Sequence, residues 1–252
     1  MILVVFENKE VGDILGNSNA PTFNHLAARY GTIGNYTAVS HPSLPNYLAL
    51  ISGSTHAIDS DCTDCVAKGS NLADTLQGSG KTWKAYLEGL PYVGFTGAAS
   101  GRYGKEHDPF LYFPQNHTPS RLRRIVPLTR FLPDLTHRRL PPFSLVVPDL
   151  CHDTHDCDIN VGDTWLARFI KPLLRGAAPR NSVVFVIFDE GTSDVGGGGK
   201  VFAIALGPLV RPHSRMVAAT NHYGLLRTIE LGLRLRLLGH SAGARAITGI
   251  WR

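Results

Sequence analysis

The chain has 252 residues, 43% of them hydrophobic and 18% charged, which is a core-forming composition and excludes a disordered protein. The net charge of +5 favours an anionic partner, but no nucleic-acid-reading motif accompanies the basic residues, so we expect no nucleic-acid partner. No apolar run approaches the roughly 20 residues that a membrane-spanning helix needs, which excludes a transmembrane segment. Because neither a repeat nor a linker is visible, we expect residues 1–252 to form a single domain.

Strand and helix patterns alternate along the chain. In order, they predict a strand at Ile2–Phe6, helices at Thr22–Tyr30, Pro45–Ser52 and Leu72–Gln77, a strand or short turn at Thr82–Tyr86, an irregular region over residues 96–120, a strand at Phe143–Val147, a helix at Thr164–Leu174, strands at Ser182–Phe188 and Val201–Leu206, and a helix at Tyr223–Leu233. Between the last two predicted strands, Gly196–Gly199 is expected to be a mobile loop. This alternation predicts an α/β fold with a mostly parallel central sheet sandwiched by helices.

Polar, ligand-type residues follow three of the predicted strands. The first is followed by Glu7-Asn8, the strand at 143–147 by Asp149–Asp158, and the strand at 182–188 by Asp189-Glu190. In open α/β sheets the ligand crevice lies at the carboxyl ends of the strands, so we expect these clusters to converge on one site. The two pairs offer only oxygen ligands, which favours calcium, magnesium or manganese over zinc or copper.

Ser43 precedes a predicted helix in the segment His41-Pro42-Ser43-Leu44-Pro45-Asn46-Tyr47. One interpretation is structural: Ser43 caps the helix, and Pro45 occupies the first turn, where proline is tolerated. The other interpretation is chemical, because a hydroxyl at a helix N-terminus lies among free backbone N–H groups that bind anions. A metal ion beside it would make that hydroxyl a nucleophile. The segment alone leaves both interpretations open.

Histidines supply further candidates. His107 lies in a polar loop, His222 lies at the start of a predicted helix, and the loop from Cys151 to Cys157 contains His152 and His155. Histidines and aspartates gathered at the end of a strand are either metal ligands or donors to a bound anion. The sequence lacks the glycine signatures of nucleotide sites.

The four cysteines form two close pairs, Cys62 with Cys65 and Cys151 with Cys157. The wider second pair does not fit a zinc cluster of two knuckles. Three disulfide connectivities are possible, and two local bridges are the simplest of them; they would indicate an oxidising compartment. No signal peptide is visible at the start of the sequence. Either a secretion signal has been removed and the protein is secreted or periplasmic, or the protein is cytoplasmic and its cysteines are reduced.

Taken together, these motifs resemble the bacterial phosphoesterase family, which contains secreted acid phosphatases and non-specific phospholipases C and belongs to the alkaline phosphatase superfamily. The resemblance extends over nearly the whole chain. It is carried by Phe6-Glu7-Asn8, the His41–Tyr47 segment with Gly53, Ile58–Cys62, Trp83–Glu88, His107–Phe110, Cys151–Cys157, Trp165-Leu166, Phe188-Asp189-Glu190 and His222. The Ser-Leu-Pro-Asn core is also similar to the Thr-Phe-Pro-Asn nucleophile segment of nucleotide pyrophosphatases. The fold that this implies has an alkaline-phosphatase-like core.

The resemblance also implies roles for individual residues. One divalent metal ion would be held by Glu7, Asn8, Asp189 and Glu190, with calcium, magnesium or manganese favoured and zinc as an alternative. Ser43 would bridge to that ion and act as the nucleophile, and Asn46 would donate to a phosphoryl oxygen. His107 and His155 would contact the phosphate, and His222 aligns with a metal-binding histidine of two-metal superfamily members. His41, His152 and Asp156 are further candidates for substrate contact, with His152 and His155 left unranked.

The expected activity is that of a metal-dependent phosphomonoesterase of the acid phosphatase type, acting through a covalent phosphoserine. Its expected substrates are phosphorylated small molecules or lipid headgroups, phosphoinositides among them. A phosphodiesterase of the phospholipase C type is the first alternative, and the openness of the loop at 96–120 would discriminate the two. An inactive phosphate- or lipid-binding protein is the second alternative, which the presence of Ser43 and of all four metal positions opposes. The oligomeric state is left open.

Overall fold

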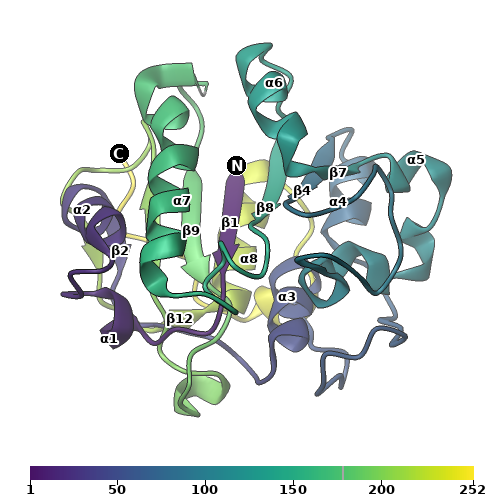
Figure 1. Cartoon of the computed structure of the whole chain (residues 1–252), viewed down its shortest axis with the longest axis horizontal. Coiled ribbons are helices and arrows are strands. Elements are labelled where there is room, and N and C mark those ends of the chain that lie inside the picture. Colours follow the sequence, from purple (N-terminus) through teal and green to yellow (C-terminus); the bar gives the residue numbers. More distant parts are fainter. Residues whose placement is uncertain (178) are drawn as a thin grey trace.

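An eight-stranded sheet forms the centre of the computed structural model, which describes residues 1–177 and 179–252 (Figure 1). Its strands, in spatial order, are β11 (Arg215–Met216), β2 (Gly31–Ile33), β10 (Ala203–Leu206), β9 (Val184–Phe188), β1 (Ile2–Phe6), β8 (Phe143–Val147), β4 (Trp83–Leu87) and β7 (Ile125–Pro127). Strand β10 runs antiparallel to β9 and β2, and the other pairs of neighbours are parallel. The prediction of a mostly parallel sheet is confirmed.

Strand β1 lies in the middle of this sheet, and each of its five residues is buried. It has a parallel neighbour on each edge: Val4 pairs with Val146 of β8 and with Val186 of β9. A strand that is covered on both faces and both edges leaves no place for a polar side chain, which explains its continuous apolar sequence. The predicted bounds of β1 and β8 match the structure residue for residue.

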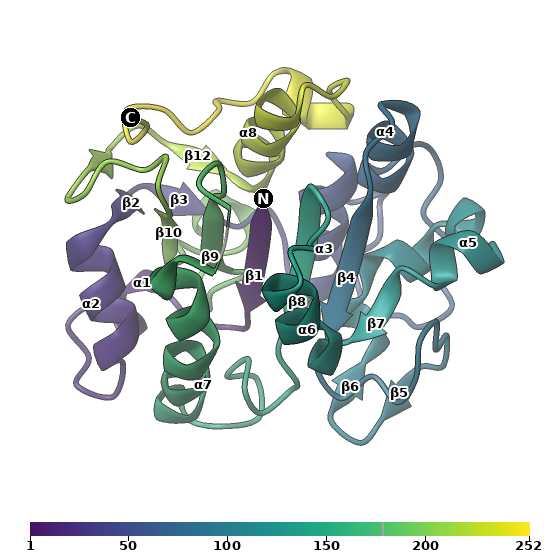
Figure 2. The ribbon, with the colours of Figure 1, turned by 90° about the horizontal axis from the view of Figure 1, so that it is seen from above.

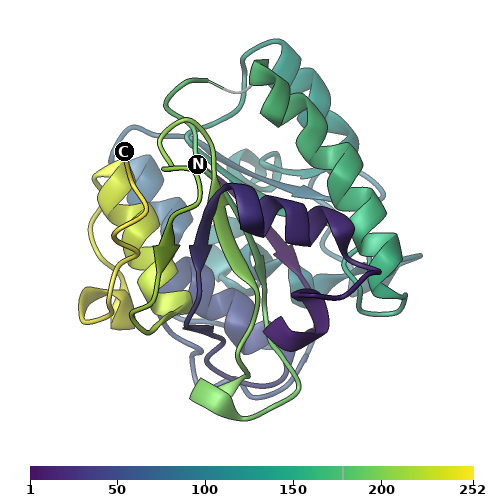
Figure 3. The same cartoon turned by 90° about the vertical axis from the view of Figure 1, so that its left-hand side faces the viewer.

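Helices cover both faces of the sheet. Figure 2 shows α2 (Pro21–Arg29), α6 (Phe131–Thr136) and α7 (Ile159–Pro172) on one side, and α3 (Ser43–Ser52), α4 (Leu72–Gly78) and α8 (His222–Leu233) on the other. In Figure 3 the green α7 and the yellow α8 again lie on opposite sides of the strands. On the α2 and α7 side, the ring of Phe6 packs 5.0 Å from that of Phe23 and 5.7 Å from that of Trp165, measured between centroids. The predicted α/β sandwich is therefore confirmed.

Short elements make up the connections. They are the helices α1 (Val11–Ile14) and α5 (Pro119–Leu122), the paired strands β3 (Tyr36–Thr37) and β12 (Thr220–Asn221), the hairpin of β5 (Ala99–Ser100) and β6 (Tyr103–Gly104), and several 3-10 turns. The region 96–120 is irregular apart from such pieces. The sequence did not indicate β2, β7 and β11, because strands of two or three residues carry no apolar run. Among the described residues, no helix has the length and apolarity needed to cross a bilayer.

Several predicted element bounds differ from the structure, and the predicted loop at Gly196–Gly199 is bonded to the rest of the fold. Helix α7 begins at Ile159 rather than Thr164, because its first turn is polar and small and shows no apolar stripe. Helix α3 begins at Ser43 rather than Pro45. The run Gly196–Gly199 lies in a loop, as predicted, and is bonded to the segment before α3: the Ala38 N–H donates to the Gly199 carbonyl at 3.0 Å. A Cβ on Gly198 would meet the neighbouring Ser40 carbonyl oxygen at 2.2 Å, so this contact requires glycine.

A buried acid on α8 makes stability depend on pH. The Glu230 carboxylate accepts hydrogen bonds from the Leu238 N–H at 2.9 Å and the Ser241 hydroxyl at 2.6 Å, and burial raises its pKa to about 7. The folded protein therefore holds this proton more tightly than the unfolded chain, and its contribution to stability is lost as the pH rises from the ordinary value of 4.5 to about 7.

We expect Glu230→Gln to abolish this fall in stability with rising pH, since glutamine does not titrate. The unfolding free energy of the variant relative to wild type should rise between about pH 5 and about pH 8, by about 1.4 kcal/mol for each unit of raised pKa. Urea denaturation at several pH values measures it. Asp59→Asn, at an exposed position, is the control. A difference between Glu230→Gln and wild type that is flat with pH would contradict the prediction.

Candidate active site

Two pairs of polar residues meet at the carboxyl ends of β1 and β9. These strands are parallel neighbours in a register that pairs Phe6 with Phe188, so the residues that follow, Glu7-Asn8 and Asp189-Glu190, leave the sheet side by side. The Asn8 N–H donates to Oδ1 of Asp189 at 3.2 Å. Glu7 and Asp189 are fully buried, and Glu190 is 6% exposed. The sequence predicted this convergence, and the strand register is its physical cause.

Ser43 lies against this group from helix α3. Pro42 occupies the N-cap, so Ser43 is the first helical residue and its side chain points away from the capping position. Its hydroxyl lies 2.8 Å from Oε2 of Glu7 and 3.2 Å from Oε1 of Glu190 and can donate to either carboxylate. Ser43 itself is 3% exposed. The interpretation of Ser43 as the N-cap is therefore wrong, and the hydroxyl belongs to the carboxylate cluster.

Four carboxyl groups share this buried volume: Glu7, Asp153, Asp189 and Glu190. Burial raises the pKa of each, and repulsion among the four raises the pKa of Glu7, Asp153 and Glu190 further. Among the described residues, Oδ2 of Asp189 and Oδ2 of Asp153 have no hydrogen-bond partner, although both atoms are buried. Buried, unpartnered oxygens of like charge are what a hard divalent cation stabilises.

The residues present fit such a cation by their chemistry. Oδ1 of Asn8 is also buried and without a hydrogen-bond partner in the part of the chain that the structure describes, which adds a neutral oxygen beside the carboxylates. Glu7, His107 and Asp153 form a second set, whose potential ligand atoms lie within 4.8 Å of one another. The donor atoms around Glu7 are mainly oxygens, the ligand type that hard divalent cations prefer.

His107 and His155 lie together next to the cluster. His107 is buried between Glu7 and Asp153, with a ring nitrogen 3.5 Å from a carboxylate oxygen of each. Burial and the neighbouring His155 lower the pKa of His107 to about 3, so its imidazole is neutral. The rings of His107 and His155 are 6.1 Å apart, and Nδ1 of the exposed His155 bonds Oδ1 of Asp156 at 2.7 Å. The structure thus brings both predicted phosphate contacts to one place.

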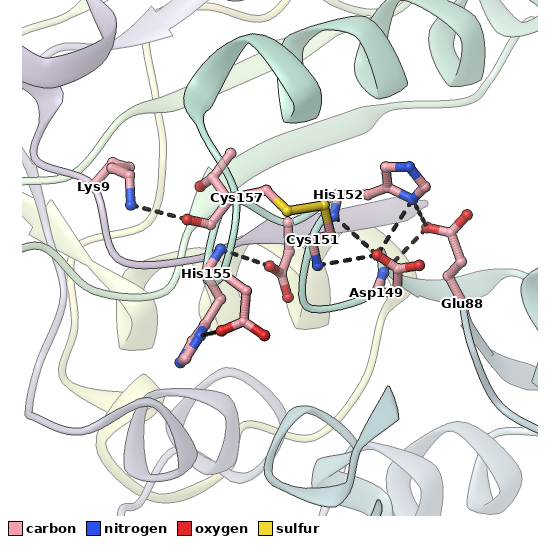
Figure 4. Close-up of a disulfide and its surroundings, with 10 residues drawn as sticks. Lys9, Glu88, Asp149, Cys151, His152, His155 and Cys157 are labelled. Atoms are coloured by element: carbon pink, nitrogen blue, oxygen red, sulfur yellow. Dashed lines mark hydrogen bonds and ion pairs between the residues drawn. A yellow bond between two sulfur atoms is a disulfide. The ribbon is translucent and has the colours of Figure 1, made fainter. Parts of the chain in front are cut away.

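His152 points elsewhere. Its Nδ1 lies 2.9 Å from Oε2 of Glu88 and 3.3 Å from Oδ1 of Asp149. Figure 4 shows this ring on one side of the Cys151–Cys157 disulfide, with His155 on the other. Of the two histidines that the sequence left unranked, His155 is the one beside His107. The predicted substrate contact of His152 does not agree with this placement, because its ring faces Glu88 and Asp149.

Both predicted disulfides are formed, and the second fastens the histidine loop. Between Cys151 and Cys157, the Thr154 hydroxyl donates to the Glu7 carbonyl at 2.8 Å, and the Glu7 N–H donates to the Asp153 carbonyl at 2.9 Å. Lys9 adds a bond to the Thr154 carbonyl at 2.9 Å (Figure 4). Asp153 is not among the predicted site residues, although its position in the polar run after β8 is a signal that points to it.

Asn46 does not match its predicted role. Its side-chain amide donates to the carbonyls of Ser40, at 2.7 Å, and Pro42, at 3.1 Å. Its oxygen accepts from the N–H groups of Val39, at 3.0 Å, and Ser40, at 3.2 Å. Both amide hydrogens are therefore engaged, and neither is directed at a phosphoryl oxygen. The Asn46 side chain therefore stabilises the turn that precedes Ser43.

His41 and His222 also differ from their predicted roles. His41 bonds Glu190 through Nδ1 and the Ser193 carbonyl through Nε2, at 3.1 Å for the second. His222 is fully buried, with Nδ1 bonded to the Tyr36 hydroxyl at 2.8 Å and Nε2 to the Asp189 carbonyl. Both nitrogens of each ring have protein partners, so neither ring is directed at a phosphate or a metal ion. Each instead holds one residue of the Asp189-Glu190 pair.

Comparison with known proteins identifies the family of this chain. The model of a family described as the Phosphoesterase family matches residues 7–235. A phosphatidylinositol-3-phosphatase of Mycobacterium tuberculosis is 34% identical over 100% of this chain and 82% of its own length. An acid phosphatase of Aspergillus fumigatus is 30% identical over 94% of this chain and 55% of its own length. The chain thus spans little more than half the length of the fungal relatives that it matches.

Solved structures share the fold at low sequence identity. Murine ectonucleotide pyrophosphatase/phosphodiesterase 5, as an inactive variant in complex with AMP, superposes with a TM-score of 0.63 at 14% identity, over 95% of this chain and 96% of its own. A protein of the alkaline phosphatase superfamily from Vibrio parahaemolyticus gives a TM-score of 0.63 at 12% identity, over 96% of this chain and 69% of its own. The predicted alkaline-phosphatase-like core is confirmed.

The contacts of Asn46 imply an effect on stability. We expect Asn46→Ala to lower the unfolding free energy by about 2–4 kcal/mol, because it leaves backbone groups of residues 39, 40 and 42 without their partner. Urea denaturation measures this, and Asn160→Ala, at an exposed position in the first turn of α7, is the control. If Asn46 only donated to a bound phosphate, Asn46→Ala would leave the stability of the free protein unchanged. An unchanged unfolding free energy would therefore contradict the role of Asn46 in stabilising the turn.

Proposed function

This chain belongs to the phosphoesterase family, and on that premise we propose that it is a metal-dependent phosphomonoesterase of the acid phosphatase type that acts through a phosphoserine at Ser43. Its relatives are named acid phosphatases and a phosphatidylinositol-3-phosphatase, and the chain is accordingly a hydrolase of phosphoric esters. The observation that carries the mechanism is the buried Ser43 hydroxyl between Glu7 and Glu190.

The first chemical step transfers the phosphoryl group to Ser43. A bond forms between Oγ and phosphorus while the bond from phosphorus to the leaving-group oxygen breaks, with the two oxygens in line. The Ser43 proton passes to Glu7 or Glu190, whose carboxylate oxygens are within 3.2 Å. In the second step a water molecule attacks the same phosphorus, the Oγ–phosphorus bond breaks, and Oγ regains a proton. The products are the free alcohol and inorganic phosphate.

We assign Glu7, Asn8, Asp189 and Glu190 to hold one divalent cation. When bound, such a cation lowers the pKa of a neighbouring hydroxyl and offsets charge on the phosphoryl oxygens. His41 and His222 contribute indirectly, because they fix Glu190 and Asp189 in the orientation that the cluster has. The four residues come from two adjacent strands, so the sheet itself holds them close.

The two histidines would act on the substrate side. His107 is buried and neutral, and its single ring N–H would donate to a phosphoryl oxygen without proton transfer. His155 is exposed and paired with Asp156, which suits a group that gives a proton to the leaving oxygen and takes one from the attacking water. Asp153, 3.5 Å from His107, limits the orientation of that ring.

The proposed substrates are phosphate monoesters of small molecules or of lipid headgroups. The relative from Mycobacterium tuberculosis, a phosphatidylinositol-3-phosphatase by name, matches the full length of this chain and supports phosphoinositides as candidates. We further propose an extracytoplasmic location, because two disulfides persist best in an oxidising compartment.

Ser43→Ala tests the nucleophile. We expect turnover of an aryl phosphate monoester to fall by about three orders of magnitude or more, because the covalent route is lost. Initial rates with the monoester and the matching diester, for the variant and for Ser60→Ala at an exposed position, provide the measurement and its control. Retention of more than about a tenth of wild-type turnover would exclude Ser43 as the nucleophile, and faster hydrolysis of the diester would favour a phosphodiesterase.

Asp189→Asn tests the cation site. We expect about one equivalent of divalent metal in the purified wild-type protein and a large loss in the variant, because a neutral amide replaces a buried carboxylate. Elemental analysis after gel filtration measures both. Asp134→Asn is the control, since it changes a carboxylate on α6 that bonds Lys84 and Tyr86. Full activity of metal-free protein in chelator would contradict the site.

A further inference from the structure

Tyr47 is a buried residue to which the mechanism above gives no role. It lies on α3 four residues after Ser43, so the two side chains occupy the same face of the helix, one turn apart. Both reach the same carboxylate: Ser43 bonds Oε2 of Glu7, and the Tyr47 hydroxyl donates to Oε1. Tyr47 is 0% exposed, so no water competes for this bond.

The ring of Tyr47 makes a second contact. It stacks on the imidazole of His107, with centroids 5.2 Å apart and planes 20° from parallel. The His107 ring nitrogens are 3.5 Å from Glu7 and Asp153, too far for good hydrogen bonds, and Nε2 has no partner among the described residues. The stack is therefore a main constraint on the plane of this imidazole.

Glu7 and His107 have different proposed roles, one in cation binding and the other in phosphate binding. Glu7 is one of the residues assigned to the cation and lies against the nucleophile, and His107 is assigned to the phosphoryl oxygens. A carboxylate can rotate about its last bond, and a hydrogen bond to one oxygen limits which direction the other one faces. Tyr47 touches both groups, through its hydroxyl in one case and its ring in the other.

We propose that Tyr47 is a positioning residue of the phosphoryl-transfer site: its hydroxyl fixes the Glu7 carboxylate for Ser43 and the cation, and its ring fixes the plane of His107 for the phosphate. This inference rests on the proposed function. The two parts of the side chain have separate effects, because one acts on cation binding and the other on substrate binding. Tyr47→Phe removes only the hydroxyl, and Tyr47→Leu removes the ring as well.

The experiment uses the full chain and Mn²⁺ as the probe. Loss of the free Mn²⁺ signal in electron paramagnetic resonance gives the dissociation constant without reference to activity. Steady-state assays with an aryl phosphate monoester at saturating Mn²⁺ give kcat and KM separately, and thermal melting reports folding. Tyr86→Phe is the matched control: Tyr86 is also fully buried and also donates to a carboxylate, at 2.8 Å from Oδ2 of Asp134 on α6.

For Tyr47→Phe we expect Mn²⁺ binding weakened about tenfold, kcat lowered about tenfold, and KM within about twofold of wild type, since the stacked ring remains. Tyr47→Leu should add an increase of about tenfold in KM. Tyr86→Phe should change the melting temperature at most and leave the Mn²⁺ affinity unaltered.

Wild-type Mn²⁺ affinity and kcat in Tyr47→Phe would overturn the inference while leaving the proposed function intact. Equal losses in Tyr47→Phe and Tyr86→Phe would overturn it as well, because they would reveal a general packing effect. Equal KM values in Tyr47→Leu and Tyr47→Phe would show that the ring does not affect substrate binding and would overturn that part of the inference. Wild-type protein that neither binds Mn²⁺ nor hydrolyses the monoester would instead refute the proposed function, and this inference with it.

Discussion

Repulsion among four buried carboxyl groups is the constraint on which the rest of the site depends. Glu7, Asp153, Asp189 and Glu190 meet where β1, β8 and β9 end, and the low exposure of these groups makes their charges costly. Hydrogen bonds from Ser43 and from Tyr47 relieve Glu7 in part. Unpartnered oxygens remain on Asp153 and Asp189 among the described residues, and the divalent cation proposed above would stabilise them.

The surrounding residues hold this strained arrangement in place. His41 bonds Glu190, His222 bonds the backbone of Asp189, and Asn46 ties the turn before Ser43. Each of these side chains is bonded to a residue of the carboxylate cluster or to the turn before Ser43. The proposed mechanism depends on such supports, because small errors in position cost much of the electrostatic stabilisation of phosphoryl transfer.

Several contacts fix the position of the loop that the Cys151–Cys157 disulfide closes. The loop is closed by Cys151 and Cys157, bonded to Glu7 through Thr154, and held by Lys9. These contacts place His155 next to His107, while His152 is drawn to Glu88 on the other side. The two histidines, which are separated by two residues, therefore lie in different surroundings. Neither their residue type nor their spacing in the sequence distinguishes them.

The sequence by itself determined the α/β class, the strands β1 and β8, the two polar pairs and Ser43, because buried strands and strand-end ligands leave patterns that are local in the chain. Only the tertiary structure could assign Asn46, His41 and His222 to supporting positions, since each role depends on partners that are distant in the sequence or on a specific turn. The same holds for Tyr47 and Asp153: their side chains matter through Glu7 and His107, residues that folding alone brings within reach.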